Sequence, residues 1–190
     1  MVLPHRIVSR TIEALWLVWA IYWFVHAFRN KRTVYQQSFA SILIERLILF
    51  ISIFVLIEVH PLRVPIFQET AAAQVSGIVL CAAGVAISIW ARKILGRNWS
   101  GVATLKENHE LVRSGPYRFV RHPIYSGIIL ALLGTVLATG PFVFSAIAVL
   151  VIAVLFKFRS LREEKLMLTQ FPEAYPQYMQ DVKSLIPYVY

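Results

Sequence analysis

Residues 121–164 read RHPIYSGIILALLGTVLATGPFVFSAIAVLVIAVLFKFRSLREE, two apolar runs joined by a short turn and bounded at both ends by charged residues. The turn at residues 139–141 (TGP) is so short that the two runs must fold back on each other as antiparallel helices. The first arm spans 17 residues and the second spans 18, so both are about 26 Å long. This hairpin predicts that His122 and Arg159 emerge from it at the same depth.

The composition of the whole chain indicates an integral membrane protein. Of its 190 residues, 58% are hydrophobic and 15% are charged, and the mean hydropathy is +0.64, which no ordinary soluble domain shows. Each apolar run approaches the roughly 20 residues that a spanning helix needs. We predict an all-α polytopic membrane protein with about five transmembrane helices, the last two forming a hairpin, plus a cytoplasmic loop and a C-terminal segment. The apolar runs are residues 12–28, 42–59, 75–91, 124–138 and 142–156.

The chain is expected to form a single integral membrane domain, residues 1–190. Residues 1–91 would hold three spans, and residues 92–190 would hold a polar loop, the last two spans and the tail. The loop of about 30 residues and the tail that follows the fifth run carry histidine and aromatic residues. Because long loops of this kind usually serve function, we expect the chemistry there.

The basic residues indicate the orientation in the membrane. The net charge is +9, and sixteen of the nineteen Lys and Arg residues fall in alternate connections, against three on the other side. By the positive-inside rule, the N-terminus lies outside and the C-terminus in the cytoplasm. Because apolar runs separate the cations, the charge does not indicate nucleic-acid binding.

Two polar clusters flank the hairpin. Arg121, His122 and Tyr125 stand before and within the start of the first arm, and Arg159 and Glu163 follow the second. Charges at a membrane boundary cost free energy unless something polar binds them, so facing clusters favour a ligand site. A plain ion pair between Arg159 and Glu163, four residues apart on one helix, is the simpler alternative.

Several other kinds of site find no support in the sequence. The chain has no Gly-x-Gly, no P-loop and no His-Glu-x-x-His motif, so the common nucleotide-binding and metalloprotease motifs are absent. Five scattered histidines and a single cysteine, Cys81, give neither a disulfide nor a zinc cluster. We therefore expect no metal site.

Small and aromatic residues indicate which sides of the spans pack against other helices and which face lipid. A stripe of small residues at helical spacing, Gly127, Ala131, Gly134 and Ala138, permits close helix packing, as Gly84 also does. The aromatic residues of the first span are interpreted as lipid-facing or interfacial anchors rather than ligand contacts. They include Trp16, Trp19, Tyr22, Trp23 and Phe24.

Five segments of the chain stand out in order: residues 95–100 (LGRNWS), 109–117 (HELVRSGPY), 121–127 (RHPIYSG), 163–164 (EE) and 171–175 (FPEAY). Together they resemble the isoprenylcysteine carboxyl methyltransferase family of membrane enzymes. The resemblance covers about half of the chain and is specific in combination. The tail departs from it, with Phe171-Pro172 where relatives often have Phe-Gly, which bears on the acceptor.

The resemblance implies an S-adenosylmethionine-dependent methyltransferase that holds this cofactor at the cytoplasmic ends of the last two spans and the tail. Arg159 matches an arginine associated with the methyl acceptor, and Asn98 an asparagine near the reaction centre, so these two would be catalytic. The cofactor pocket would use His109, Glu110, Leu111, Val112, Tyr117, His122, Pro123, Ile124, Tyr125 and Glu163.

The acceptor is expected to be lipophilic, entering from the lipid bilayer, and to carry a carboxylate such as that of a C-terminal S-isoprenylcysteine. A carboxylate is ionised at neutral pH and needs no general base, whereas an amine would need one, for which His122 is the nearby candidate. The alternatives are a phospholipid or small-molecule N- or S-methyltransferase on the same scaffold, a sterol-type reductase using NADPH, and a non-enzymatic membrane protein.

Overall fold

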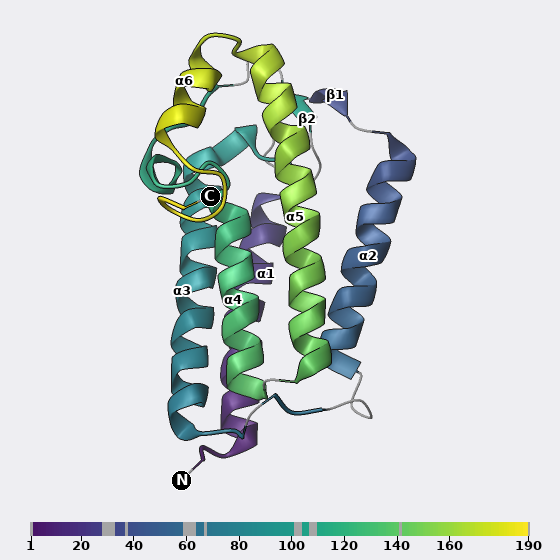
Figure 1. The fold of residues 1–190 in the computed structure, drawn as a ribbon, viewed down its shortest axis with the longest axis vertical. Coiled ribbons are helices and arrows are strands. Elements are labelled where there is room, and N and C mark those ends of the chain that lie inside the picture. Colours follow the sequence, from purple (N-terminus) through teal and green to yellow (C-terminus); the bar gives the residue numbers. More distant parts are fainter. Residues whose placement is uncertain are drawn as a thin grey trace.

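The long helices run side by side along the long axis of the protein, as Figure 1 shows. The structure is a computed structural model that describes residues 2–27, 33–36, 38–58, 64–66, 68–100, 104–106, 110–140 and 142–189. The long helices are α1 (His5–His26), α2 (Phe39–Glu58), α3 (Ala71–Leu95), α4 (Pro123–Thr139) and α5 (Val143–Gln170), and a short α6 (Ala174–Asp181) follows. The 3-10 turns are η2 (Gly96–Asn98) and η3 (Gly115–Arg118).

Several of these helices are suited to a lipid bilayer. By length and composition, α1, α3 together with η2, and α5 can each cross a membrane, and α4 is a shorter apolar helix. The prediction of a helical multi-pass membrane protein is confirmed to that extent. At 28 residues, α5 is about 42 Å long, longer than the roughly 30 Å of a hydrocarbon core. Its C-terminal turns therefore project beyond the core and carry charged residues there.

The hairpin predicted from the turn is confirmed. α4 begins at Pro123, where a proline lacking an N–H costs no helical hydrogen bond. α4 ends at Thr139, Gly140 follows with φ of 128°, a value that favours glycine, and α5 begins at Val143. α5 returns antiparallel to α4 (Figure 1). This arrangement brings the charged ends of both arms to one end of the molecule.

Backbone-to-backbone packing joins α3 to α4 through the predicted stripe of small residues. A methyl group added at Gly127 would lie 2.7 Å from the carbonyl oxygen of Gly84, and one at Gly134 would lie 2.6 Å from that of Gly77. Real Cβ atoms do not approach this closely, so the glycines are required at these positions. The stripe fixes the depth of α4 against α3, and with it the position of His122.

We expect Gly134→Val to destabilise the protein strongly, because its side chain would collide with the backbone of Cys81 and Gly77. Overpacking of this kind costs about 1–3 kcal/mol or more. The matched control is Leu133→Val, which introduces the same residue at a neighbouring position that is 49% exposed. Thermal unfolding in detergent micelles would measure both. Equal melting temperatures for the two variants would contradict the close packing of α3 and α4.

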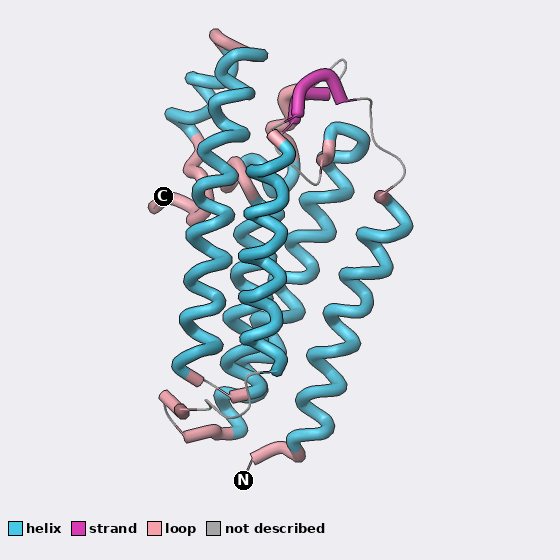
Figure 2. The backbone as a smooth tube through the Cα atoms, turned by 90° about the vertical axis from the view of Figure 1, so that its right-hand side faces the viewer, coloured by secondary structure: helices cyan, strands magenta, loops and turns pink. Residues whose placement is uncertain are grey.

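One small sheet was not predicted. β1 (Thr33–Gln36) pairs antiparallel with β2 (Thr104–Lys106) and bridges two loops far apart in the sequence. Strands of three or four residues carry too little periodicity to be recognised locally. In Figure 2 they lie at the end of the helices opposite to the N-terminus.

The C-terminal segment turns back toward the helices. After α5, α6 reverses direction, and the following residues descend until the C-terminus lies level with the start of α4 (Figure 1). The N-terminus lies at the other end of the molecule (Figures 1 and 2). The charged end of the hairpin is therefore covered by α6 and the tail, and the candidate site lies beneath them.

Candidate functional site

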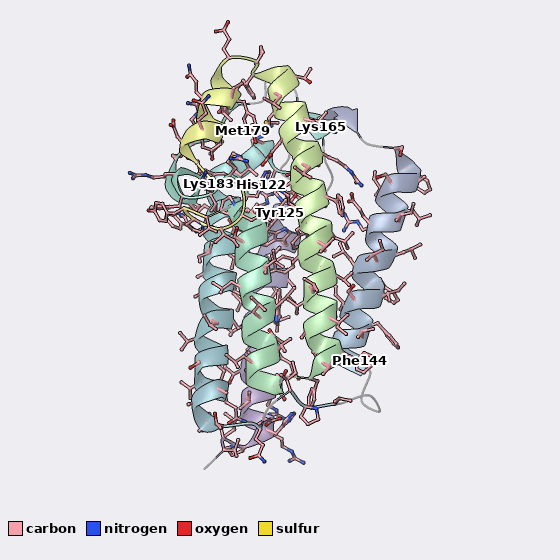
Figure 3. All side chains as sticks on the ribbon, viewed as in Figure 1. His122, Tyr125, Phe144, Lys165, Met179 and Lys183 are labelled. Carbon is pink, nitrogen blue, oxygen red and sulfur yellow. The ribbon has the colours of Figure 1, made fainter. Side chains whose placement is uncertain are left out.

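A cavity of about 320 Å³ lies where the ends of the helices meet η2, η3 and α6. This volume is at the lower end of the range for small-molecule sites. Its residues come from every long helix and from α6, although it is centred on the two clusters that flank the hairpin. Among those clusters, it is lined by Arg121, His122 and Tyr125 of the first and by Arg159 and Glu163 of the second. Figure 3 shows His122 and Tyr125 one turn apart near the start of α4.

Where the inward-facing sides of the long helices line the cavity, its wall is apolar and aromatic. Trp19 and Trp23 of α1 stack with ring centroids 4.3 Å apart, and Phe156 of α5 stacks on Tyr125 at 4.8 Å. Leu49 of α2 and Ile128 of α4 also line this part. An apolar wall next to a charged cluster suits a ligand with one polar and one apolar end.

Glu163 is the meeting point of the two arms of the hairpin. Its Oε1 atom accepts hydrogen bonds from the Tyr125 hydroxyl at 2.6 Å and from Arg159 Nε at 3.2 Å. Its Oε2 atom lies 3.5 Å from His122 Nδ1. The predicted equal depth of His122 and Arg159 is thus confirmed, because one carboxylate contacts both. The ion pair expected as the simpler alternative also exists, but it lines the cavity.

Glu164, the next residue, faces away from the cavity and is buried. Its Oε1 atom lies 2.9 Å from Arg121 Nη2 and 3.0 Å from His122 Nε2, and it accepts the Ser184 hydroxyl at 3.1 Å. Adjacent glutamates therefore hold His122 from both of its ring nitrogens. One carboxylate contributes to the cavity, and the other ties α4, α5 and the tail together.

Electrostatics favour the protonated form of His122. Burial alone would lower the pKa of this imidazole, but its hydrogen bonds to Glu163 and Glu164 and their negative charges outweigh that effect and raise the pKa above its ordinary value. The two carboxylates therefore favour a protonated imidazole beside the cavity. Because each ring nitrogen already faces a carboxylate, the imidazole is poorly placed to act as a general base.

Arg159 supplies a second cation to the cavity. Its side chain is 11% exposed, its Nη1 atom lies 4.0 Å from Glu45 Oε2 of α2, and its guanidinium lies 5.6 Å from the centroid of the Tyr125 ring. Glu45 also bonds Arg162, the next arginine of α5. These contacts fix the direction of the Arg159 side chain, which still lines the cavity.

The η2 turn contributes Asn98, which is 8% exposed and lines the cavity. Its Oδ1 atom is buried without a hydrogen-bond partner in the described part of the chain. Nearby, the Arg92 guanidinium stacks over the Trp99 ring at 4.4 Å and donates to the carbonyl of Gly96 at 2.7 Å, which stabilises this turn. A buried amide oxygen without a partner at a cavity wall is suited to accept a hydrogen bond from a ligand.

The structure brings most of the predicted site residues to one cavity. It is lined by Asn98, Glu110, Leu111, Val112, Tyr117, His122, Ile124, Tyr125, Arg159 and Glu163. Pro123 is buried at the start of α4, where it shapes the backbone and is not among the lining residues. His109 lies outside the described residues. The roles assigned to these residues stay predictions.

Sequence reasoning missed part of the wall. The interpretation of the first span holds for Phe24, which is 70% exposed, but Trp19 and Trp23 turn inward and line the cavity. Tyr175 and Tyr178 of α6 also line it, and the Tyr178 hydroxyl donates to the carbonyl of Tyr117 at 2.5 Å. The motif at residues 171–175 was a signal for α6, whereas nothing local showed which face of α1 turns inward.

Comparisons with known proteins agree with this architecture. A family model described as phospholipid methyltransferase matches residues 72–174, from the first turn of α3 to the start of α6. The protein-S-isoprenylcysteine O-methyltransferase of Schizosaccharomyces pombe is 36% identical over 96 residues, which cover 50% of this chain and 41% of that protein. A probable protein-S-isoprenylcysteine O-methyltransferase of Oryza sativa subsp. indica is 28% identical over 169 residues, which cover 86% of each chain.

A solved structure shares the fold. The eukaryotic intramembrane Ras methyltransferase ICMT (isoprenylcysteine carboxyl methyltransferase) aligns with a TM-score of 0.56 and 23% identity. The alignment covers 80% of this chain and 54% of that one. The chain thus spans about half the length of this structure, and the alignment with the fission yeast protein spans less than half of that relative. At this identity the structural likeness shows the fold.

Proposed function

The chain belongs to the phospholipid methyltransferase family, and from this premise we propose that it transfers a methyl group from S-adenosylmethionine to a carboxylate on a lipophilic acceptor. A C-terminal S-isoprenylcysteine, the acceptor named for the fission yeast and rice relatives, is an acceptor of this kind. The proposal includes the cofactor, the acceptor and the roles of the site residues. It treats residues 1–190 as one domain.

One observation favours a carboxylate acceptor. An arginine faces the cavity, while both ring nitrogens of the neighbouring histidine already contact carboxylates. Arg159 lines the cavity and can bind a carboxylate. His122 has carboxylates against both ring nitrogens and a raised pKa, so it is poorly suited to deprotonate an amine. A carboxylate acceptor needs no base because it is ionised at neutral pH.

The residues of the cavity suit the cofactor. S-adenosylmethionine, when bound, supplies a methyl group made electrophilic by a sulfonium sulfur. Glu163 and Glu110 would meet its cationic or hydroxyl groups, and His122 with the N-terminus of α4 would meet its carboxylate. Asn98 supplies a buried acceptor that lacks a partner within the described chain. The apolar walls at Leu111, Val112 and Ile124 would hold the rest.

The chain's own part in the reaction would be positioning and the exclusion of water. Arg159 would hold the acceptor carboxylate, because Glu163 and Glu45 fix the direction of its guanidinium. The aromatic wall of Trp19 and Phe156 would bury the lipophilic part of the acceptor. Orientation of two reactants in a water-poor site is enough to accelerate transfer to a carboxylate by several orders of magnitude.

The same proposal includes the arrangement in the membrane. α1 to α5 would form five spans, with the N-terminus outside and the C-terminus in the cytoplasm, as the distribution of Lys and Arg predicts. The cavity would then lie at the cytoplasmic boundary. The water-soluble cofactor would enter from the cytoplasm, and the lipophilic acceptor would enter from the bilayer between the helices.

An amine of a phospholipid is the second candidate acceptor, and the name of the matching family model favours it. A panel of prenylcysteine analogues, phosphatidylethanolamine and small amine or thiol acceptors would separate the two. Transfer to the amine but not to the prenylcysteine would overturn the carboxylate assignment and leave the methyltransferase assignment standing. Binding of NADPH instead of the methyl donor would favour a reductase.

The test of the cofactor assignment is the binding of labelled S-adenosylmethionine to the purified full chain. We expect saturable binding by the parent, and at least tenfold weaker binding by Glu163→Ala and His122→Ala, since each loses a charged contact. The matched control is Glu173→Ala, an exposed carboxylate outside the cavity. Equal binding by all variants, or none by the parent, would overturn the proposal.

A further inference from the structure

The segment that follows α6 lies directly against the start of α4. The backbone N–H of Arg121 donates to the carbonyl of Lys183 at 2.8 Å, and that of His122 donates to the carbonyl of Ser184 at 3.0 Å. Val120 and Lys183 form a parallel bridge. Figure 3 shows Lys183 beside His122. Residues about 60 positions apart in the sequence thus share one short ladder next to the cavity.

The side chain of Ser184 turns inward from this ladder. It is 4% exposed, and its hydroxyl donates to Glu164 Oε1 at 3.1 Å. The same oxygen accepts Arg121 Nε at 3.1 Å and Nη2 at 2.9 Å, and lies 3.0 Å from His122 Nε2. A single carboxylate oxygen therefore has partners from the start of α4 and from the tail.

These partners restrict how the carboxylate can turn. Arg121 approaches through two nitrogens and also donates to the carbonyls of Met179 and Val182, so its guanidinium is held by α6 and the tail as well. Ser184 approaches the oxygen from the tail directly. Because His122 has no side-chain freedom beyond two torsions, the position of Glu164 Oε1 sets the orientation of the imidazole.

We propose that Ser184 is a positioning residue of the methyl-donor site, holding Glu164 so that His122 presents Nδ1 to Glu163 and the cavity. The tail after α6 thereby becomes part of the site, although Ser184 is not among the residues that line the cavity. This inference rests on the proposed function. It differs from that function in assigning a role to a residue that would not touch the donor, the acceptor or the methyl group.

The experiment compares Ser184→Ala with Ser184→Thr and with a matched buried serine. Ser160 is the control, because it is also buried and its hydroxyl donates to the backbone carbonyl of Lys157 at 2.8 Å rather than to the carboxylate. The full chain in detergent micelles is assayed for the KM of S-adenosylmethionine, the KM of the acceptor, kcat and the melting temperature.

We expect Ser184→Ala to raise the KM of the methyl donor about tenfold, as loss of a hydrogen bond to a charged group does. The acceptor KM and the melting temperature should change little, and Ser184→Thr should restore the parent value. A purely structural role would instead lower the melting temperature and affect both substrates together. That result, an unchanged donor KM, or an equal change in Ser160→Ala would overturn the proposal.

A second measurement separates this inference from the proposed function. In protein labelled with ¹⁵N-histidine, the His122 signals are assigned by comparison with His122→Gln. Ser184→Ala should shift the His122 Nε2 signal, and Ser160→Ala should leave it in place. Unchanged His122 signals would overturn the positioning role even if the parent binds S-adenosylmethionine. If the parent binds no donor while the signals shift, the proposed function fails and the contact itself is supported.

Discussion

Arg159→Met should lower kcat/KM for a prenylcysteine carboxylate on the order of 100-fold and leave the affinity for S-adenosylmethionine within about threefold of the parent value. A charge-assisted hydrogen bond to the reacting group is worth about this much in other enzymes. Cofactor affinity should persist because Glu163 keeps its contacts with Tyr125 and His122. Initial rates with a prenylcysteine acceptor and direct binding of the donor would measure the two quantities.

Arg162→Met is the matched control for this variant. Arg162 lies one turn further along α5 and bonds the same Glu45, but its side chain is 44% exposed and does not line the cavity. We expect its activity to stay within about twofold of the parent. Equal losses in both variants would mean that the link to α2 matters rather than the acceptor contact. Full activity in Arg159→Met would remove Arg159 from the acceptor site.

Glu164→Ala is expected to give the largest loss of stability. The carboxylate is 7% exposed and faces Arg121 and His122, each at 8% exposure. Removing one partner of a buried ion pair leaves charge without compensation and costs about 3–5 kcal/mol. Equilibrium unfolding in mixed micelles, followed by tryptophan fluorescence, would measure the change. Glu173→Ala, at an exposed carboxylate, should change the free energy of unfolding by less than about 0.5 kcal/mol.

The same variant tests how stability depends on pH. The pKa of His122 is higher in the folded protein than its ordinary value, so protonation favours the folded state. That contribution is complete below the pKa of the unfolded histidine, about 6.5, and is lost as pH rises through the raised folded pKa. Tyr125, Glu163 and Glu164 are the polar groups against the ring, and Arg121 pairs with Glu164. Removing Glu164 should move this loss of stability to lower pH. An unshifted pH profile of stability would contradict the raised pKa of His122.

Hydropathy and one short turn were sufficient to predict the hairpin. Apolar runs must become helices in a bilayer because each backbone group has to find its partner within the segment. With the turn length, this fixes the register of α4 against α5 and brings His122 and Arg159 to Glu163, as the structure confirms. α4 begins at Pro123 for an equally local reason, the missing N–H of proline.

The sequence motifs indicated most of the cavity wall but not its full extent. Glu110, Tyr117 and Tyr125 were identified because they belong to motifs of consecutive residues. Trp19 was interpreted as a lipid-facing or interfacial anchor, since an apolar helix in a membrane lacks the polar face that shows which side turns inward. Its indole nitrogen donates to Ser88 of α3 at 3.1 Å, a contact between residues 69 positions apart.

The membrane class, the hairpin and the residues that meet at its charged end could be predicted from the residues alone, because they follow from local hydropathy, turn length and helical rise. The neighbours of those residues are seen only in the packed fold: α1 behind the cavity, Glu45 of α2 beside Arg159, and the tail against His122. Such contacts join segments far apart in the chain. They depend on side-chain packing between helices, for which no local pattern of residues is a signal.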